Sequence, residues 1–93
     1  MMTLINNNDG YKNGQREGLW ESHYRNGQIH SKGFYQKGKR EGVWEFYYRN
    51  GQLEYSGPYK NGIQDGAFEY YYSKGQLDAT QSGIYKSGKK ISS

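Results

Sequence analysis

The chain has 93 residues, the length of one small domain, with a net charge of +4 and a hydrophobic content of 32%. It contains no cysteine, which excludes disulfides and thiolate metal sites. Aromatic residues make up 17% of the chain, and together with 14 regularly placed glycines they favour an ordered β protein over a disordered chain.

An internal repeat runs through the chain. Its marker, Tyr-x-x-Gly, begins at Tyr11, Tyr35 and Tyr59 at intervals of 24 residues and returns at Tyr85 after 26 residues. Between markers, a Gly-x-Trp/Phe-Glu segment precedes a Tyr-x-Asn/Lys-Gly-Gln segment in every unit. The pattern predicts a single repeat domain over 1–93, with a partial repeat at 1–11, repeats at 11–34, 35–58 and 59–84, and a C-terminal partial repeat at 85–93.

Each unit contains two turn signals. Asn26-Gly27 is typical of a two-residue hairpin turn, because both central residues need a positive φ that Asn and Gly accept, and the Tyr-x-x-Gly marker supplies the turns between units. A turn about every twelve residues leaves strands of about six to eight residues. Frequent glycines and the missing 3.6-residue period exclude helices. We therefore expect an all-β fold, a single antiparallel meander of repeated β-hairpins in an open twisted sheet of seven or eight strands.

The turns predict which residues face one another. A two-residue loop at Asn26-Gly27 places Trp20 opposite Gly33, Ser22 opposite Ser31 and His23 opposite His30. Continued through the next turn, the same register places Ser31 opposite Trp44. One side of the sheet then carries the rings, with a glycine across from each of the largest, and Trp44 is expected to be the most buried. The other side is polar, with a few apolar residues at Leu19, Phe34, Val43 and Tyr47.

The segment EGVWEFYYRNGQL at 41–53 closely resembles the MORN-repeat variant of bacterial proteins, and the resemblance extends from Tyr11 to about Gly88. The chain departs from that pattern in its shortened first unit, in Phe68 at the Trp position and in its stretched third unit. The resemblance implies an open hairpin sheet and a binding role. Similar proteins, of the YwqK type, serve as scaffolds and as antitoxin or immunity partners of toxins, and some relatives have been proposed to contact phosphoinositides.

No set of residues in the sequence supports catalysis. Glu21, Glu45 and Glu69 recur once per unit on the polar side, where cross-strand Lys and Arg partners explain them better than an acid/base or cation site. His23 and His30 form only a weak candidate metal pair, because a third ligand is missing. Neither a Ser-His-Asp or Cys-His arrangement nor a phosphate-binding loop can be assembled. We therefore expect a protein that is not an enzyme and has no cofactor or metal.

The aromatic side is the expected binding surface. It could serve only as the hydrophobic core, but no predicted helix or second sheet covers it. The leading hypothesis is a protein–protein interaction module, an antitoxin-like inhibitor or a scaffold. The alternative is a binder or sequestering protein for a planar anionic small molecule such as a nucleotide, with rings for stacking and Lys/Arg for phosphate. The candidate contact residues are Trp20, Tyr24, Trp44, Phe46, Tyr48, Tyr55, Phe68, Tyr70 and Tyr72.

Charge and hydropathy narrow the expected partners and location. Positive charge clusters only at Lys86, Lys89 and Lys90, whereas nucleic-acid-binding proteins concentrate it, so nucleic acid is not expected. Apolar runs are too short to span a bilayer, and the start lacks a basic-then-apolar signal pattern. We expect a soluble cytoplasmic protein with a protein partner or a second copy as its ligand, and any membrane contact rests on the resemblance alone.

Overall fold

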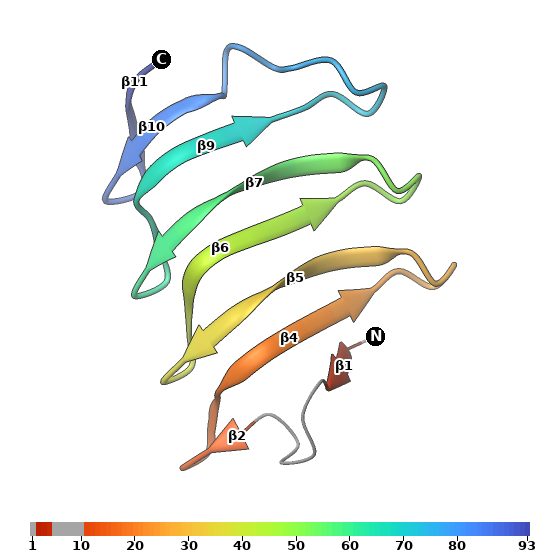
Figure 1. The fold of residues 1–93 in the computed structure, drawn as a ribbon, viewed down its shortest axis with the longest axis vertical. Helices are drawn as coiled ribbons and strands as arrows, with labels where there is room; N and C mark the ends of the chain where they lie inside the picture. The colour runs from red at the N-terminus through yellow and green to blue at the C-terminus, as the bar shows by residue number, and fades with distance from the viewer. Residues whose placement is uncertain (1, 5–10) are drawn as a thin grey trace.

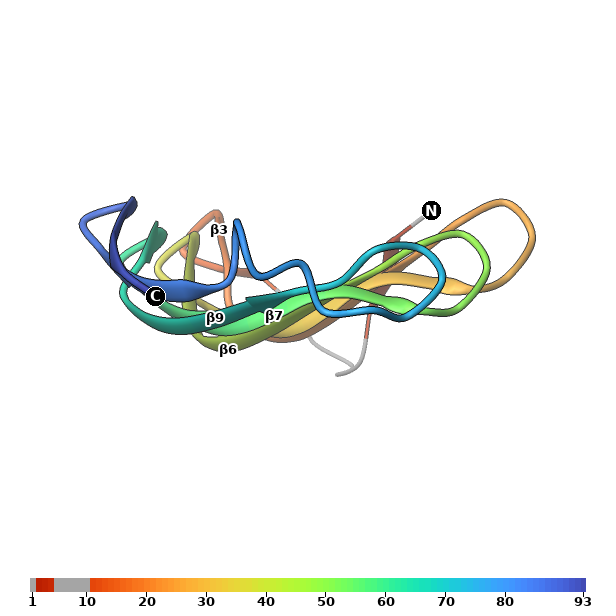
Figure 2. The same cartoon turned by 90° about the horizontal axis from the view of Figure 1, so that it is seen from above.

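The computed structural model describes residues 2–4 and 11–93, and these residues form a single layer of antiparallel strands without a helix (Figure 1). The principal dimensions of 39 × 32 × 12 Å are those of one curved sheet (Figure 2). The predicted open all-β meander is therefore confirmed. The order of strands across the sheet is β1 (Met2–Leu4), β4 (Gly18–His23), β5 (Ile29–Gln36), β6 (Lys39–Tyr47), β7 (Leu53–Lys60), β9 (Gly66–Tyr70), β10 (Gly83–Lys86) and β11 (Lys89–Ser92). Of the expected partial repeat at 1–11, residues 1 and 5–10 lie outside the described residues.

Tight turns form one end of the sheet. Short strands lie at this end: β2 (Tyr11–Lys12) pairs with β3 (Gln15–Arg16) in a separate two-stranded sheet, and β8 (Ile63–Gln64) pairs with β7. Asn13, Lys37, Asn61 and Ser87 each have a φ of 53° and each precede a glycine of positive φ. Two successive positive φ values define a two-residue hairpin turn whose twist matches that of the strands. The turns predicted from Tyr-x-x-Gly are therefore confirmed.

The loops at the opposite end differ from the expectation. Gly27 has a φ of 91°, but Asn26 is not among the residues with positive φ. Gly27 N donates to Tyr24 O, and Tyr24 N donates to Gln28 O, so the loop has three residues and ends in a left-handed glycine. The two-residue turn predicted here was wrong because the Asn side chain serves another purpose: its Oδ1 accepts from Gln28 N at 3.0 Å, which holds the loop closed.

Glycines bend the sheet toward one face. Gly18, Gly42 and Gly66 lie where the tight-turn ends join the long strands, and their φ values are 86°, 75° and 136°. Glycine adopts such values without the steric cost of a side chain. The tight-turn ends curl to one side (Figure 2), which gives the sheet a concave and a convex face.

The aromatic side is the concave face, and it forms the core. The buried rings pack edge to face and in stacks, as Trp44 does with Tyr35 at 5.0 Å and with Phe46 at 6.0 Å between ring centroids. Phe68 is 1% exposed and Trp44 2%, so Phe68, and not Trp44 as predicted, is the most buried ring. The buried rings are Trp20, Tyr35, Trp44, Phe46, Tyr59 and Phe68, with Tyr55, Tyr70 and Tyr85 packed against them.

Two arginines from the curled ends cover these rings. The Arg40 guanidinium carbon lies 5.1 Å from the Trp44 ring centre and 5.0 Å from that of Phe46. Arg16, one repeat earlier, lies 5.3 Å from the Trp20 ring centre. A guanidinium over a ring face is attracted by the ring and shields it from water. The sequence-based expectation concerned only a covering helix or second sheet, and it did not include this covering by arginines, because that depends on the bend at the glycines.

The register explains why glycines face the large rings. Trp20 pairs with Gly33 and Trp44 with Gly57, as predicted, but Ser31 pairs with Phe46 and not with Trp44 because the register shifts between β5 and β6. A Cβ added at Gly33 would collide with the Trp44 ring. Gly33 therefore leaves room for the Trp44 ring of the following repeat, and Gly57 does the same for Phe68, which locks these units together.

Side chains of each repeat also bond to the backbone of the next. The Tyr48 hydroxyl donates to Tyr71 O at 2.6 Å, and Asn50 Nδ2 donates to Ser73 O at 3.0 Å. Since stacked repeats are stabilised mainly by their nearest neighbours, these bonds stabilise the array. The equivalent bonds elsewhere join Tyr24 to Tyr47 O, Asn26 to Arg49 O, Glu17 to Lys37 N and Glu41 to Asn61 N.

Candidate functional site

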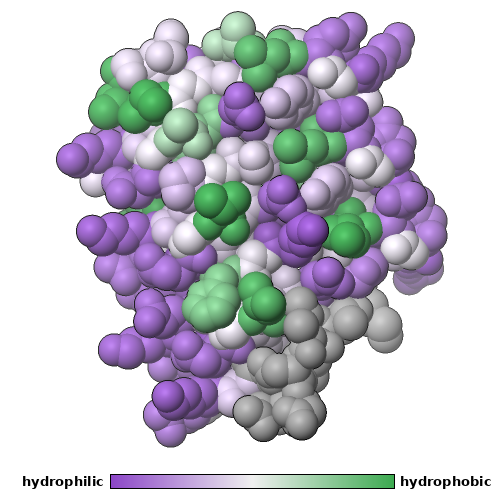
Figure 3. Space-filling view, viewed as in Figure 1, coloured by the Kyte–Doolittle hydropathy of each residue, from purple (hydrophilic) through white to green (hydrophobic). Residues whose placement is uncertain are grey.

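An apolar stripe crosses the convex face. Side chains alternate between the faces of a strand, so residues next to the core rings point to the opposite side. Leu19 pairs with Phe34, Val43 with Pro58 and Ala67 with Ile84, which gives three cross-strand pairs, although the shifted register between β5 and β6 pairs Phe34 with Glu41. The face seen in Figure 3 shows apolar patches between polar side chains. We call the set the convex stripe: Leu19, Phe34, Val43, Pro58, Ala67 and Ile84.

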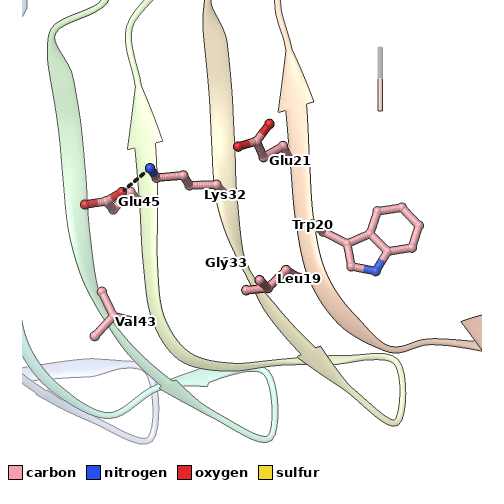
Figure 4. Close-up of a pocket in the computed structure, with 7 residues that line it drawn as sticks. All are labelled: Leu19, Trp20, Glu21, Lys32, Gly33, Val43 and Glu45. Atoms are coloured by element: carbon pink, nitrogen blue, oxygen red, sulfur yellow. Dashed lines mark ion pairs between the residues drawn. The ribbon is translucent and has the colours of Figure 1, made fainter. Parts of the chain in front are cut away.

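The convex stripe is open to solvent. Val43 is 63% exposed and Leu19 53%, although Val43 lies in the middle of β6 and Leu19 within β4. A shallow hollow of about 380 Å³ lies between them, and Trp20 points away from its charged residues into the core (Figure 4). Apolar side chains gathered on an open face mark an interaction surface more often than isolated ones do.

A charged row runs beside the convex stripe. Glu21 pairs with Lys32, Lys32 with Glu45, Glu45 with Ser56, and Ser56 with Glu69, so one residue per strand forms a continuous line. Lys32 Nζ lies 3.6 Å from Glu45 Oε1 (Figure 4). The row thus carries three carboxylates and one ammonium group, and its net charge is negative although that of the chain is positive. We call it the acidic row.

Two tyrosines hold carboxylates of the acidic row in place. The Tyr47 hydroxyl donates to Glu45 Oε1 at 3.0 Å, and the Tyr71 hydroxyl donates to Glu69 Oε1 at 3.1 Å. Burial and this bond raise the pKa of Tyr47, and the bond to Glu69, more than burial, raises that of Tyr71. Both hydroxyls therefore remain donors at neutral pH, and the carboxylates keep a defined orientation.

Two further hollows lie in the described part of the chain. One of about 250 Å³ at the tight-turn end is lined by polar residues that include Lys12 and Lys37, and no ring lines it. The other, of about 310 Å³, lies over Ala67 and Ile84 and is mainly apolar. Neither hollow, nor the one beside Val43 with its two carboxylates, combines an aromatic surface with converging cations, as a nucleotide would require.

The structure brings six of the nine predicted aromatic residues together in the concave core, and it leaves Tyr24, Tyr48 and Tyr72 outside that cluster. Trp20, Trp44, Phe46 and Phe68 are buried. Tyr72 is 50% exposed. The remaining tyrosines are half-buried: Tyr24, Tyr48, Tyr55 and Tyr70. Binding at this face stays a prediction, and the burial of its largest rings leaves them little surface for a partner.

The two histidines are not directly opposite each other, so the predicted pairing was wrong. His23 pairs with Ile29, and a register irregularity leaves His30 unpaired in the ladder. His30 Nδ1 lies 3.2 Å from Ser22 Oγ, and His23 Nε2 lies 3.8 Å from Glu21 Oε1. Within the described residues, His, Cys, Asp and Glu side chains form no group of three that could hold a metal ion.

Asp78 is a buried carboxylate that the sequence reasoning overlooked. It is 6% exposed and accepts hydrogen bonds from Thr80 N, Gln81 N and Gln81 Nε2. The bond from the Gln81 side chain is the main cause that lowers the pKa of Asp78 below its ordinary value. Asp78 orders the loop that contains the two extra residues of the third unit, and that insertion was the available signal.

Three segments of the chain, 16–37, 40–61 and 64–84, match the family described as MORN repeat variant, and together they cover more than half of the sequence. No curated protein matches the chain at a significant level. In the described residues, no helix is long and apolar enough to cross a membrane.

Proposed function

The chain belongs to the MORN repeat variant family, whose repeats generally act as binding modules, and we propose that it is a non-enzymatic module for protein binding. Its partner would be another protein, and its binding surface would be the convex stripe together with the acidic row. An inhibitor of the antitoxin type would cover the surface of its partner, and a scaffold would hold partners together. Neither role requires the protein to catalyse a reaction.

One observation carries the proposal, namely the exposure of the convex stripe. The next residues along the same strands, Trp20 and Trp44, are 3% and 2% exposed, while Leu19 and Val43 remain more than half exposed. Their exposure leaves a free energy of burial of about 25 cal/mol per Å² for a partner to gain. The open face extends over several strands, which suits the roughly 800 Å² that each protein contributes to a standard interface.

The side chains beside the convex stripe support binding without catalysis. Glu45 is held by Tyr47 and Lys32, and Glu69 by Tyr71. An acid/base catalyst needs a pKa matched to its task and a substrate held against it, which deep pockets supply. The open hollow beside Glu45 provides no such enclosure.

Affinity capture from the native host tests the proposal. The wild-type chain and the Leu19→Ser/Val43→Ser variant would be used as baits, and both eluted proteins and small molecules would be identified by mass spectrometry. We expect a protein that the wild type enriches and the variant loses, with equal melting temperatures for both baits. A partner retained equally by the two baits, or a small molecule as the sole specific ligand, would contradict the proposal.

A further inference from the structure

The charge beside the convex stripe indicates the chemistry of its partner. Glu21, Glu45 and Glu69 lie along one border of the stripe, and Lys32 is the ammonium group within that row. The chain as a whole has a net charge of +4, so the negative charge here is local. Complementary charge across an interface speeds encounter and suppresses wrong partners. A partner should therefore bring positive charge to this border.

The carboxylates are oriented before any partner arrives. Glu45 accepts from Tyr47 at 3.0 Å and Glu69 from Tyr71 at 3.1 Å in the second and third units, while in the first unit Glu21 Oε1 lies 3.8 Å from His23 Nε2. A carboxylate that is already held loses less side-chain freedom when an ammonium or guanidinium group binds it. The acidic row is thus a prearranged line of acceptors beside an apolar surface.

The dimensions of the convex stripe set the size of the partner. It runs from Leu19 on β4 to Ile84 on β10 and crosses six strands. At about 4.8 Å between strands it is about 24 Å long. A helix of about 16 residues spans that length at 1.5 Å per residue. Such a helix can carry an apolar ridge with basic residues on its flank.

We propose that the convex stripe binds a cationic amphipathic segment of a partner protein, with apolar side chains on the stripe and Lys or Arg on the acidic row. The inference rests on the proposed function, since it names the chemistry of the partner for the same surface. A second copy of the chain packing by this face would bring one ammonium group for three carboxylates, and an anionic surface would be repelled.

A synthetic peptide tests this chemistry. The probe is a fluorescein-labelled amphipathic peptide of about 16 residues with a Leu ridge flanked by Lys, and its matched control carries Glu at every Lys position. Binding is followed by fluorescence anisotropy. We expect the Lys peptide to bind at least about tenfold more tightly than the Glu peptide, with an affinity that falls as salt screens the charges.

Variants of the acidic row test where the peptide binds. Glu21→Gln/Glu45→Gln/Glu69→Gln should weaken binding of the Lys peptide about tenfold, the sum of three exposed ion pairs. Lys32→Gln is the matched control of opposite sign and should tighten binding. Leu19→Ser/Val43→Ser should weaken it as well. Circular-dichroism melts of all variants should stay close to the wild type.

The outcomes separate this inference from the proposed function. Equal binding of the Lys peptide to wild type and to the triple Gln variant, binding of the Glu peptide as tight as that of the Lys peptide, or no binding of the Lys peptide would overturn the inference. Dimers in sedimentation velocity that Leu19→Ser/Val43→Ser abolishes would also overturn it. If affinity capture still yields a protein whose binding depends on the convex stripe, only the inference of a cationic amphipathic partner is contradicted. If affinity capture also yields no such protein, the proposed function is contradicted as well.

Discussion

The two faces of the sheet are built from neighbouring residues of the same strands, yet they differ in what covers them. On the concave face, Trp44 is 2% exposed beneath the Arg40 guanidinium. On the convex face, Val43, the preceding residue, is 63% exposed. The bend at the glycines closes one face over its rings and leaves the other open. The comparison shows that in this single-layer sheet the core occupies one face, and the opposite face keeps apolar side chains exposed to solvent.

The largest difference between the faces should appear on truncation of neighbouring residues. Trp44→Ala removes a buried ring and the bond from its Nε1 to Phe34 O, and it should cost about 3–5 kcal/mol of unfolding free energy. Val43→Ser, at the exposed neighbour, should change it by about 0.5 kcal/mol or less. Urea denaturation of both variants measures the contrast. A similar cost at the two positions would mean that both faces belong to the core.

A methyl group at Gly33 should destabilise the concave face next most strongly. Gly33→Ala places a Cβ against the Trp44 ring, and overpacking of this kind should cost about 1–3 kcal/mol. The control is Lys32→Gln, at the neighbouring residue of β5 whose side chain lies in the acidic row, which should stay within about 0.5 kcal/mol of wild type. The melting temperatures of the two variants are compared in thermal melts that are followed by tryptophan fluorescence. A Gly33→Ala variant as stable as the control would show that the ring does not need this space.

A smaller effect should come from the side chains that join repeats. Asn50→Ala loses the bonds to Ser73 O and from Gln52 N and should cost about 1 kcal/mol. Lys74 occupies the same loop position in the third unit, and Lys74→Ala should stay within about 0.5 kcal/mol. The urea concentrations at the unfolding midpoints of the two variants, compared with that of the wild type, measure these costs. Equal effects at the two positions would show that the bond between repeats adds nothing.

The smallest effect should be the pH dependence contributed by Asp78. Its pKa in the folded chain lies below the ordinary 3.8, so its stabilising contribution is present above that value and is lost as the pH falls through the folded pKa. Asp78→Asn removes this proton uptake. Between about pH 5 and pH 2, wild-type stability should therefore fall more steeply than that of Asp78→Asn. Parallel curves would show that Asp78 is not a stabilising carboxylate.

Much of the fold follows from the sequence because glycine and tyrosine positions are local signals. The Tyr-x-x-Gly turns, the pairing of Trp20 with Gly33 and the aromatic face were predicted from spacing alone. The three-residue loop at Asn26 was not, because Asn-Gly also accepts a two-residue turn, and the choice depends on hydrogen bonds of the Asn side chain. Because the prediction assumed a two-residue turn instead of this three-residue loop, it also placed His30 opposite His23, which the structure does not show.

The candidate site was harder to predict than the fold. Alternation along β4 and β6 places Leu19 and Val43 opposite the rings, and both were noticed on the polar side. Their importance depends on the bend at Gly42, which brings Arg40 over the core and makes the concave face self-covering. A bend of the whole sheet is a long-range property that residue spacing does not reveal, so the sequence pointed to the rings as the binding surface.

Nuclear magnetic resonance of the labelled protein, titrated with the partner identified by affinity capture, tests the division between the two faces most directly. The methyl groups of Leu19, Val43 and Ile84 report on the convex face, and the rings of Tyr55 and Tyr70 report on the concave face. We expect the methyl signals to shift on binding while the ring signals stay in place. Ring signals that shift while the methyl signals remain would contradict the account and return the binding surface to the aromatic face.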